Sequence, residues 1–207
     1  RFGSWVVPFA LADVRGQVAA IDARMLQEEA AALRSRFAVS VPGSPLGQAL
    51  ALHLVLGRLA REHRVDSFAV DCWNEVLPEF GATPCMGFAF DGYQVACEGD
   101  LLLAVALLAG EAISGGPGFV GDFYSLNEDT GHSVFVHCGA CAALHSSTVP
   151  VAIAPQEPPG TVHGKGTVVS CRPVLPRGPG TLVQLHGREL DRLHLRRCRI
   201  ASTRFTH

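Results

Sequence analysis

The stretch Val95-Ala96-Cys97-Glu98-Gly99-Asp100-Leu101 decides the fold, because it joins a short apolar run to an apolar helix through two acidic residues. Residues 93–97 have the pattern of a short buried strand, and Asp100 is a suitable N-cap for the helix that follows. In an open parallel sheet, ligands bind beyond the carboxyl ends of the strands. Glu98 falls there, so a functional role and a second capping role, stabilised by the helix dipole, are both open.

A second acidic residue, Asp122, follows the apolar run Phe119-Val120-Gly121. A carboxylate next to buried apolar segments needs a buried partner, a metal ion or an acid/base role. Taken alone, Asp122 is also typical of a turn. Together, Glu98 and Asp122 would face each other across the boundary between the two halves of the chain, which is a common location for a binding site.

Upstream of this stretch, helix and strand patterns alternate, which predicts a parallel α/β sheet. Asp13 is the expected N-cap of the first helix, and Ser44 that of the second, with Pro45 at its first position. The expected elements are, in order, a helix over 13–36, a strand over 37–41, a helix from 44 to about 63 and a strand over 66–71.

Downstream, the Gly-rich segment 114–118 is followed by strand-like runs without convincing helices between them. The sequence therefore predicts a parallel-sheet α/β domain over residues 1–114 and an antiparallel β domain, barrel-like or a sandwich, over residues 115–207. The chain starts at Arg1 and stops abruptly at His207, so we expect a fragment of a longer protein with a truncated β domain. The strand-like runs cover residues 119–126, 133–136, 149–154, 166–172 and 181–185.

The composition limits the class of protein. Hydrophobic residues make up 48% of the 207 residues and charged residues only 17%, which indicates a compact interior. The net charge of −2 favours neither a nucleic acid nor an acidic membrane as partner. Seven cysteines without the dense spacing of a secreted scaffold indicate reduced thiols and a cytoplasmic protein. The single lysine, Lys165, lies in a Gly-Lys-Gly turn, which argues against a Schiff-base enzyme.

Two further groups of residues each allow two interpretations. The first, His137, Cys138, Cys141 and His145, has the local look of a zinc site but lacks a second close cysteine pair. His137 is also explained as a hydrogen-bonded histidine at the end of a strand. The second group follows the strand over 66–71, where Trp73 and Asn74 are placed either to line a sugar pocket or to serve as a packed tryptophan and part of a helix cap.

Residues 66–137 resemble the C-terminal half of the L-fucose and L-arabinose isomerase family. Weaker similarity continues through residues 166–168 and 178–182, the latter resembling a hairpin of the family's β domain. The order and spacing of the short pieces make the match specific. The pieces are Cys72-Trp73, Pro84-Cys85-Met86, Cys97-Glu98-Gly99-Asp100, Gly121-Asp122-Phe123 and Phe135-Val136-His137-Cys138-Gly139.

The resemblance implies a metal-dependent aldose–ketose isomerase, of which this chain would hold the second α/β domain and the C-terminal β domain. It implies that Glu98 and Asp122 are metal ligands and acid/base groups, and that His137 is a third ligand of a divalent ion, most commonly Mn²⁺. It also implies a sugar substrate and a homo-oligomer with active sites between subunits. A further family histidine near the C-terminus has three candidates, namely His186, His194 and His207.

This chemistry suits the residues independently. Moving a carbonyl between C1 and C2 requires the removal of a proton from the carbon next to the carbonyl. A metal ion bound to both substrate oxygens stabilises the enediolate intermediate, and carboxylates can transfer the proton. Oxygen ligands with one imidazole suit manganese or magnesium better than zinc. Two alternatives stay open: a non-catalytic sugar-binding or regulatory relative with the same fold, and, more distantly, a structural zinc protein.

Overall fold

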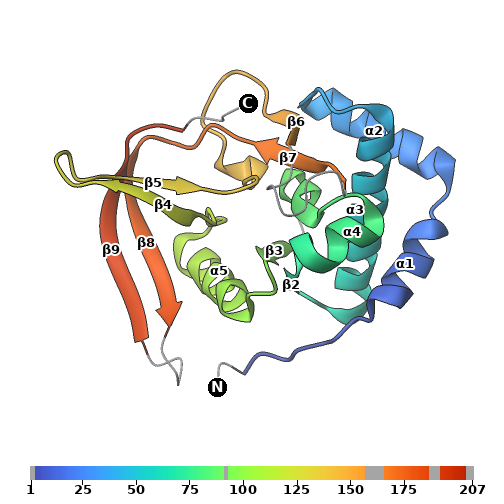
Figure 1. The fold of residues 1–207 in the computed structure, drawn as a ribbon, viewed down its shortest axis with the longest axis horizontal. Helices are drawn as coiled ribbons and strands as arrows, with labels where there is room; N and C mark the ends of the chain where they lie inside the picture. Colours follow the sequence, from blue (N-terminus) through green and yellow to red (C-terminus); the bar gives the residue numbers. More distant parts are fainter. Residues whose placement is uncertain (1–2, 91–92, 157–165, 187–191, 204–207) are drawn as a thin grey trace.

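The computed structural model describes residues 3–90, 93–156, 166–186 and 192–203. Figure 1 shows a mixed α/β arrangement in which α1 to α4 lie on one side and two β hairpins on the other. The helices are α1 (Leu11–Ala19), α2 (Ala23–Arg36), α3 (Gly43–His63), α4 (Leu77–Phe80) and α5 (Leu101–Ser114). The strands are β1 (Ala38–Val39), β2 (Ser67–Val70), β3 (Gln94–Cys97), β4 (Asp122–Asn127), β5 (His132–Val136), β6 (Ala152–Gln156), β7 (Val168–Arg172), β8 (Gly178–His186) and β9 (Arg192–Ile200).

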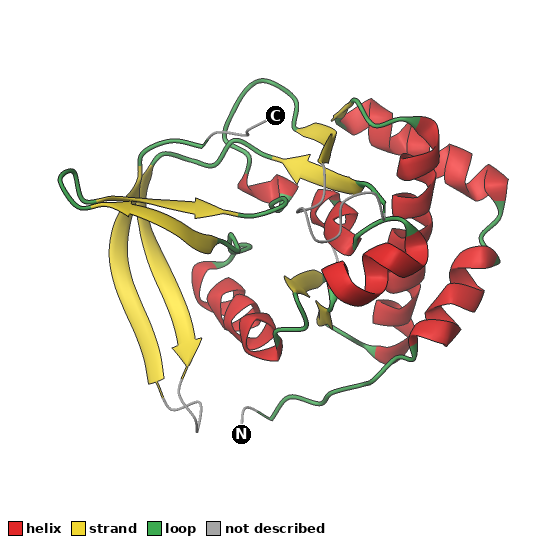
Figure 2. Cartoon of the chain, in the orientation of Figure 1, coloured by secondary structure: helices red, strands yellow, loops and turns green. Residues whose placement is uncertain are grey.

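These strands form four small sheets (Figure 2). β2 and β3 pair in parallel, as the alternation of elements predicted, whereas β4–β5 and β8–β9 are antiparallel hairpins. In the remaining sheet, β6 pairs in parallel with β1 and antiparallel with β7. The strands of the second half are thus antiparallel to one another. Within the described ranges no sheet closes on itself, so the barrel-like part of the expectation is not confirmed.

Helix α3 forms the centre of the core because apolar side chains occupy several of its faces. Leu46 and Leu50 pack with residues of α2, β6 and β7 in one cluster, and Val55 and Leu59 pack with Phe68 of β2 in a second. Full burial of one such side chain contributes about 1.5–3 kcal/mol. The first cluster therefore joins β6 and β7 to the helices across the expected domain boundary, and the division at residues 114 and 115 stays a prediction.

The helices start at other residues than expected in three places. The continuous helix over residues 13–36 was wrong, because the Asp22 carboxylate accepts the backbone N–H groups of Arg24 and Met25 at 2.7 and 3.3 Å and so starts α2. Asp13 lies inside the first turn of α1 rather than at its cap. Helix α3 begins at Gly43 after Pro42, so Ser44 is inside the helix and does not cap it.

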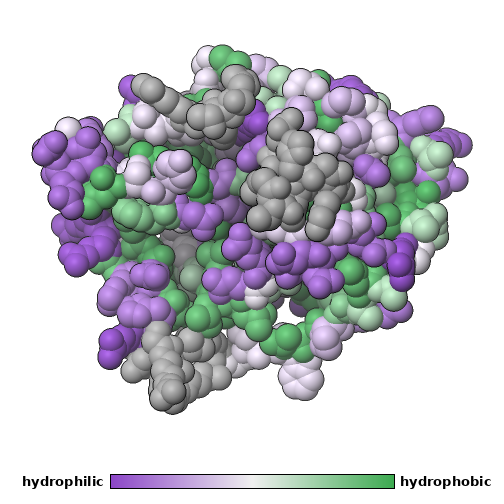
Figure 3. All heavy atoms as spheres, in the orientation of Figure 1, coloured by the Kyte–Doolittle hydropathy of each residue, from purple (hydrophilic) through white to green (hydrophobic). Residues whose placement is uncertain are grey.

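Several apolar side chains of the hairpins lie on the surface. Phe123 and Tyr124 of β4 are 60% and 73% exposed, and Leu193 and Leu195 of β9 are exposed as well. Figure 3 shows apolar surface over the hairpins and α5 between hydrophilic regions. Among the described helices, none has the length and apolar content needed to cross a bilayer.

Candidate functional site

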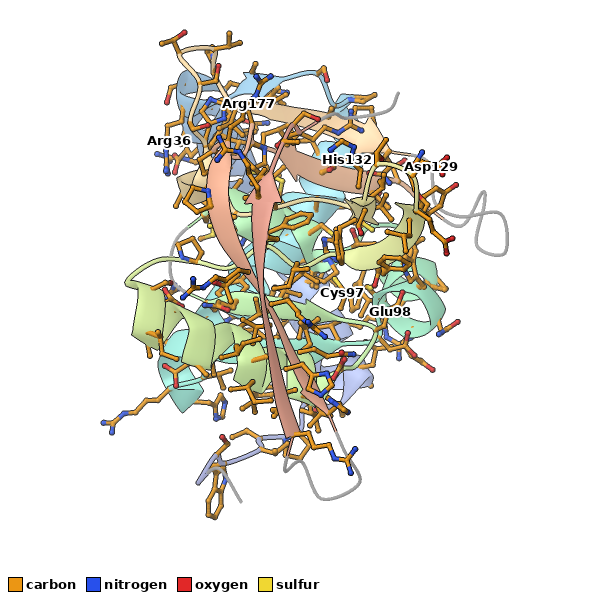
Figure 4. All side chains as sticks on the ribbon, turned by 90° about the vertical axis from the view of Figure 1, so that its left-hand side faces the viewer. Arg36, Cys97, Glu98, Asp129, His132 and Arg177 are labelled. Carbon is orange, nitrogen blue, oxygen red and sulfur yellow. The ribbon has the colours of Figure 1, made fainter. Side chains whose placement is uncertain are left out.

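The carboxyl ends of β2 and β3 meet because the two strands are parallel and Val70 lies opposite Cys97. The chain leaves β3 through a tight turn in which Glu98 and Gly99 both have positive φ, 58° and 72°, and Gly99 N–H donates to Val70 O at 3.0 Å. A non-glycine residue in this left-handed region costs about 1–3 kcal/mol, and such strain is concentrated at functional sites. The Glu98 side chain is exposed at this edge (Figure 4).

The capping role at the start of α5 belongs to Asp100. Its carboxylate accepts the N–H groups of Leu102 and Leu103 at 2.8 and 3.0 Å, which confirms the expected N-cap. This bond network fixes the turn that carries Glu98 and accounts for Asp100 without a ligand. Glu98 is therefore the residue of this turn that still requires an explanation.

The β4–β5 hairpin brings Asp122 next to His137. Asp122 is the first residue of β4 and lies opposite Val136, and His137 directly follows β5. The His137 Nδ1 lies 2.8 Å from Gly139 O, and the Gly139 N–H points to the same nitrogen at 3.5 Å. These contacts with the following backbone fix the orientation of the ring. The ring is half-buried, and Phe119 contacts it edge-on.

The segment after His137 is fixed on β7. Ser170 Oγ donates to Cys138 O, and Ala140 N–H donates to Cys171 O at 2.9 Å. A Cβ atom at Gly139 would lie 3.1 Å from Cys171 O, so the close approach to the β7 backbone requires glycine. The sheet β1-β6-β7 thus holds the backbone next to His137 in place.

Four cysteines that are far apart in the sequence meet between these two turns. We call Cys72, Cys85, Cys97 and Cys138 the thiol cluster. The thiol of Cys97 interacts with those of Cys72 and Cys85, and the thiol of Cys85 interacts with that of Cys138. The Glu98 N–H donates to the Cys72 sulfur, and the Asp122 charge acts on Cys138. Glu98 and Asp122 therefore adjoin the same cluster from different segments of the chain.

The hydrogen bonds polarise the thiol cluster. The bond from Cys138 lowers the pKa of Cys85 well below its usual value, and the same bond, with burial, raises the pKa of Cys138. In the same way the bond with Cys97 lowers the pKa of Cys72 and raises that of Cys97.

The segment of sequence that carries the two carboxylates is poor in basic residues. No lysine or arginine occurs between Arg64 and Lys165, although this segment carries Glu98, Asp100 and Asp122. Negative charge gathered in one segment in this way attracts cations. Nevertheless, among the described residues no group of three or more His, Cys, Asp or Glu is arranged to hold a metal ion. The ligand set Glu98, Asp122 and His137 stays a prediction.

The zinc interpretation finds no support in the described residues. His145 Nδ1 accepts Val174 N–H at 2.9 Å and His145 Nε2 donates to Val149 O at 2.6 Å, so both ring nitrogens hold loop backbone. The Cys138 thiol bonds to Cys85 instead.

The remaining expected residues have structural surroundings that leave their roles as predictions. Asp71 accepts the backbone N–H and the side-chain amide of Asn74 at 3.2 and 3.0 Å, as the capping interpretation requires. Trp73 is half-buried. His186 and His194 contact each other near the loop end of the β8–β9 hairpin, with ring centroids 4.2 Å apart, and His207 lies outside the described residues.

Part of the chain is similar in sequence to known sugar isomerases. No family model matches the sequence. The chain is 30% identical over 86 residues to the sulfoquinovose isomerase of Priestia megaterium, which is 40% of this chain and 19% of that protein; the enzyme of Priestia aryabhattai gives the same values. A sulfoquinovose isomerase from a Clostridium species is 29% identical over 137 residues, 58% of this chain and 30% of the relative. The chain thus spans between about a fifth and a third of the length of these relatives.

Proposed function

We propose that this chain is part of an aldose–ketose sugar isomerase that transfers a proton between C1 and C2 through an enediolate. The observation that carries the proposal is the convergence of Glu98 and Asp122, from two separate segments, on the thiol cluster. The partial similarity to sulfoquinovose isomerases supports the reaction class. Those names also make a sulfonated aldose the first substrate to test, before neutral aldoses.

In the proposed reaction, two carboxylates share the proton transfer. One carboxylate takes the proton from the carbon next to the carbonyl, and the other acid donates a proton to the neighbouring oxygen or carbon. This requires two acids on opposite sides of the sugar. The left-handed turn fixes the backbone position of Glu98, and the strand pairing fixes that of Asp122. His137 flanks Asp122 at the end of the hairpin and is anchored by the contact of its Nδ1 with Gly139 O.

The role of the predicted Mn²⁺ is decided by the activity assay. The described residues do not fit a complete metal centre as they are arranged, so the proton transfer is assigned to the side chains alone. Addition and chelation of Mn²⁺ during the assay determine whether Glu98, Asp122 and His137 act as its ligands.

The proposal includes assembly with further copies of the chain. Exposed apolar side chains on both hairpins, such as Phe123, Tyr124 and Leu195, form the kind of surface that a partner covers. Size-exclusion chromatography with light scattering measures the mass in solution.

The second candidate function is a sugar-binding protein without turnover. It needs the same fold and no metal-binding group, and none of three or more side chains forms within the described ranges. Calorimetric binding of the sugar without any ketose formation would support this alternative.

The test of the proposed function is aldose–ketose interconversion by the purified chain, with and without Mn²⁺. Glu98→Gln keeps the shape of the side chain and removes its charge, so turnover should fall by about 10²- to 10⁴-fold. Glu128→Gln is the matched control, since Glu128 is an exposed acid in the turn between β4 and β5. Unchanged turnover in Glu98→Gln would remove Glu98 from the site.

A further inference from the structure

We propose that Arg172 binds a sulfonate group at the end of the sugar that is remote from C1. The inference rests on the proposed function, because it names a group of the proposed substrate and the residue that recognises it. Arg172 is the last residue of β7, at the end of the strand that points toward the hairpins (Figure 1). It is the only basic side chain that is buried among the described residues, with 7% of its surface exposed.

The Arg172 guanidinium is buried without a counter-charge. One of its terminal nitrogens donates to Pro155 O at 3.0 Å, and this carbonyl is a neutral partner. Among the residues that the structure describes, no carboxylate forms an ion pair with Arg172. A guanidinium has five N–H donors, and burying its charge is costly unless an opposite charge pairs with it. Arg172 therefore keeps both hydrogen-bond donors and a positive charge for an anionic ligand.

The alternation of side chains along β7 places Arg172 on the face that carries the turn after His137. Cys171 packs into a core cluster with side chains of α3, so it points toward the helices. Successive side chains of a strand point to opposite faces, so Ser170 and Arg172 share the other face, about 7 Å apart along the strand. On that face Ser170 Oγ donates to Cys138 O, and Cys138 directly follows His137. Arg172 is thus two strand positions from the backbone next to the candidate site.

The segment after β5 is bound to the chain on both sides of Arg172. Ala140 N–H donates to Cys171 O at 2.9 Å, and Ser146 N–H donates to Val174 O at 2.9 Å. Arg172 lies between these two attachment points, and both are made by backbone groups of its neighbours. The position of Arg172 beside this segment is therefore fixed without using its own side-chain donors, which stay available to a ligand.

A sulfonated sugar needs a cation that the sequence around the carboxylates does not supply. No lysine or arginine occurs between Arg64 and Lys165, so the segment with Glu98 and Asp122 contributes only negative charge to the electrostatic field. Arg172 comes from β7, outside that segment, and offsets this charge. The planar fork of a guanidinium can also bond two oxygens of one oxyanion at the same time.

Isothermal titration calorimetry with two sugars tests the proposal. The chain is titrated with sulfoquinovose and with glucose, which has a hydroxyl in place of the sulfonate. We expect tighter binding of sulfoquinovose than of glucose. Arg172→Gln removes the charge, so it should lower the affinity for sulfoquinovose about 10- to 100-fold, the usual effect of losing hydrogen bonds to a charged group, and leave the affinity for glucose unchanged. Arg172→Lys keeps the charge and should restore part of the loss.

Arg177→Gln is the matched control, since Arg177 is an exposed arginine five residues further along the chain, and it should leave both affinities unchanged. Far-UV circular dichroism verifies that each variant is folded. An equal loss for both sugars in Arg172→Gln would show a structural role and overturn the proposal. Failure of the chain to bind sulfoquinovose would overturn it as well, and so would tighter binding of glucose 6-phosphate than of sulfoquinovose.

The binding measurement separates this inference from the proposed function. Binding of sulfoquinovose that depends on Arg172, without any ketose formation, would support the inference while the isomerase proposal fails. Turnover of sulfoquinovose with the same affinity in Arg172→Gln as in the original chain would support the isomerase and remove Arg172 from the substrate site.

Discussion

Stability should fall steeply in mild acid because of one half-buried histidine, His53, on α3. His53 stacks on Phe90 with ring centroids 4.1 Å apart, and its Nδ1 lies 2.7 Å from the Tyr93 hydroxyl. Burial, and secondarily the positive charge of Arg61, lower the pKa of His53 from 6.5 to about 4. The unfolded chain therefore binds a proton between these two pH values that the folded chain does not bind.

The sign and size of the effect follow from this difference. The folded pKa is lowered, so the stabilisation is complete above pH 6.5 and is lost as the pH falls toward about 4. One pKa unit corresponds to about 1.4 kcal/mol, so His53 alone should lower the free energy of unfolding by about 3 kcal/mol over this range. The total free energy of unfolding of a small domain is only about 5–15 kcal/mol, so the change is large.

Urea denaturation at a series of pH values measures this change in the free energy of unfolding. His53→Asn removes the titrating ring, so the variant should lose this part of the slope between pH 6.5 and about 4. His132→Asn is the matched control, because His132 is an exposed histidine at the start of β5 (Figure 4), and its slope is compared with that of His53→Asn. If His53→Asn and the original chain show the same dependence on pH, the burial argument is refuted.

Two smaller predictions concern the backbone that positions the site. Gly139→Ala places a Cβ 3.1 Å from Cys171 O and should cost about 1–3 kcal/mol in urea unfolding, whereas Gly110→Ala in α5, where nothing lies within 4 Å, should stabilise the chain slightly. Asp100→Ala removes the N-cap of α5 and should cost about 1 kcal/mol in a thermal melt. Asp13→Ala, which removes an acid without a cap bond, is its control. Equal losses in either pair would contradict the assigned contacts.

Local patterns of the sequence are sufficient to predict the elements around Glu98. The two apolar runs that became β2 and β3, their parallel pairing and the cap at Asp100 all follow from short stretches. The apolar pattern does not show the break before α2, because apolar residues keep helical spacing across it while the Asp22 side chain caps a new helix. Pairing of β1 with β6 joins residues more than a hundred positions apart, and no local signal reports it.

The thiol cluster could not be predicted from the sequence either, because distant segments meet there without a local signal. Its four members come from four separate segments, and each looked like an isolated buried cysteine or, for Cys138, part of a local zinc pattern. One signal was present: Cys72, Cys97 and Cys138 all lie at or just beyond the ends of strands. Residues at such ends gather at one edge when the strands share a direction, but β5 belongs to a different sheet from β2 and β3.

The most direct test of the central claim is an NMR measurement of sulfoquinovose incubated with the chain in D₂O. Proton transfer through an enediolate by Glu98 and Asp122 exchanges the transferred hydrogen with solvent, so the ketose formed should carry deuterium at C1. Both ketose formation and deuterium uptake should be lost in Glu98→Gln and in Asp122→Asn and retained in Glu128→Gln. A ketose free of deuterium, or one formed at full rate by both site variants, would contradict the account.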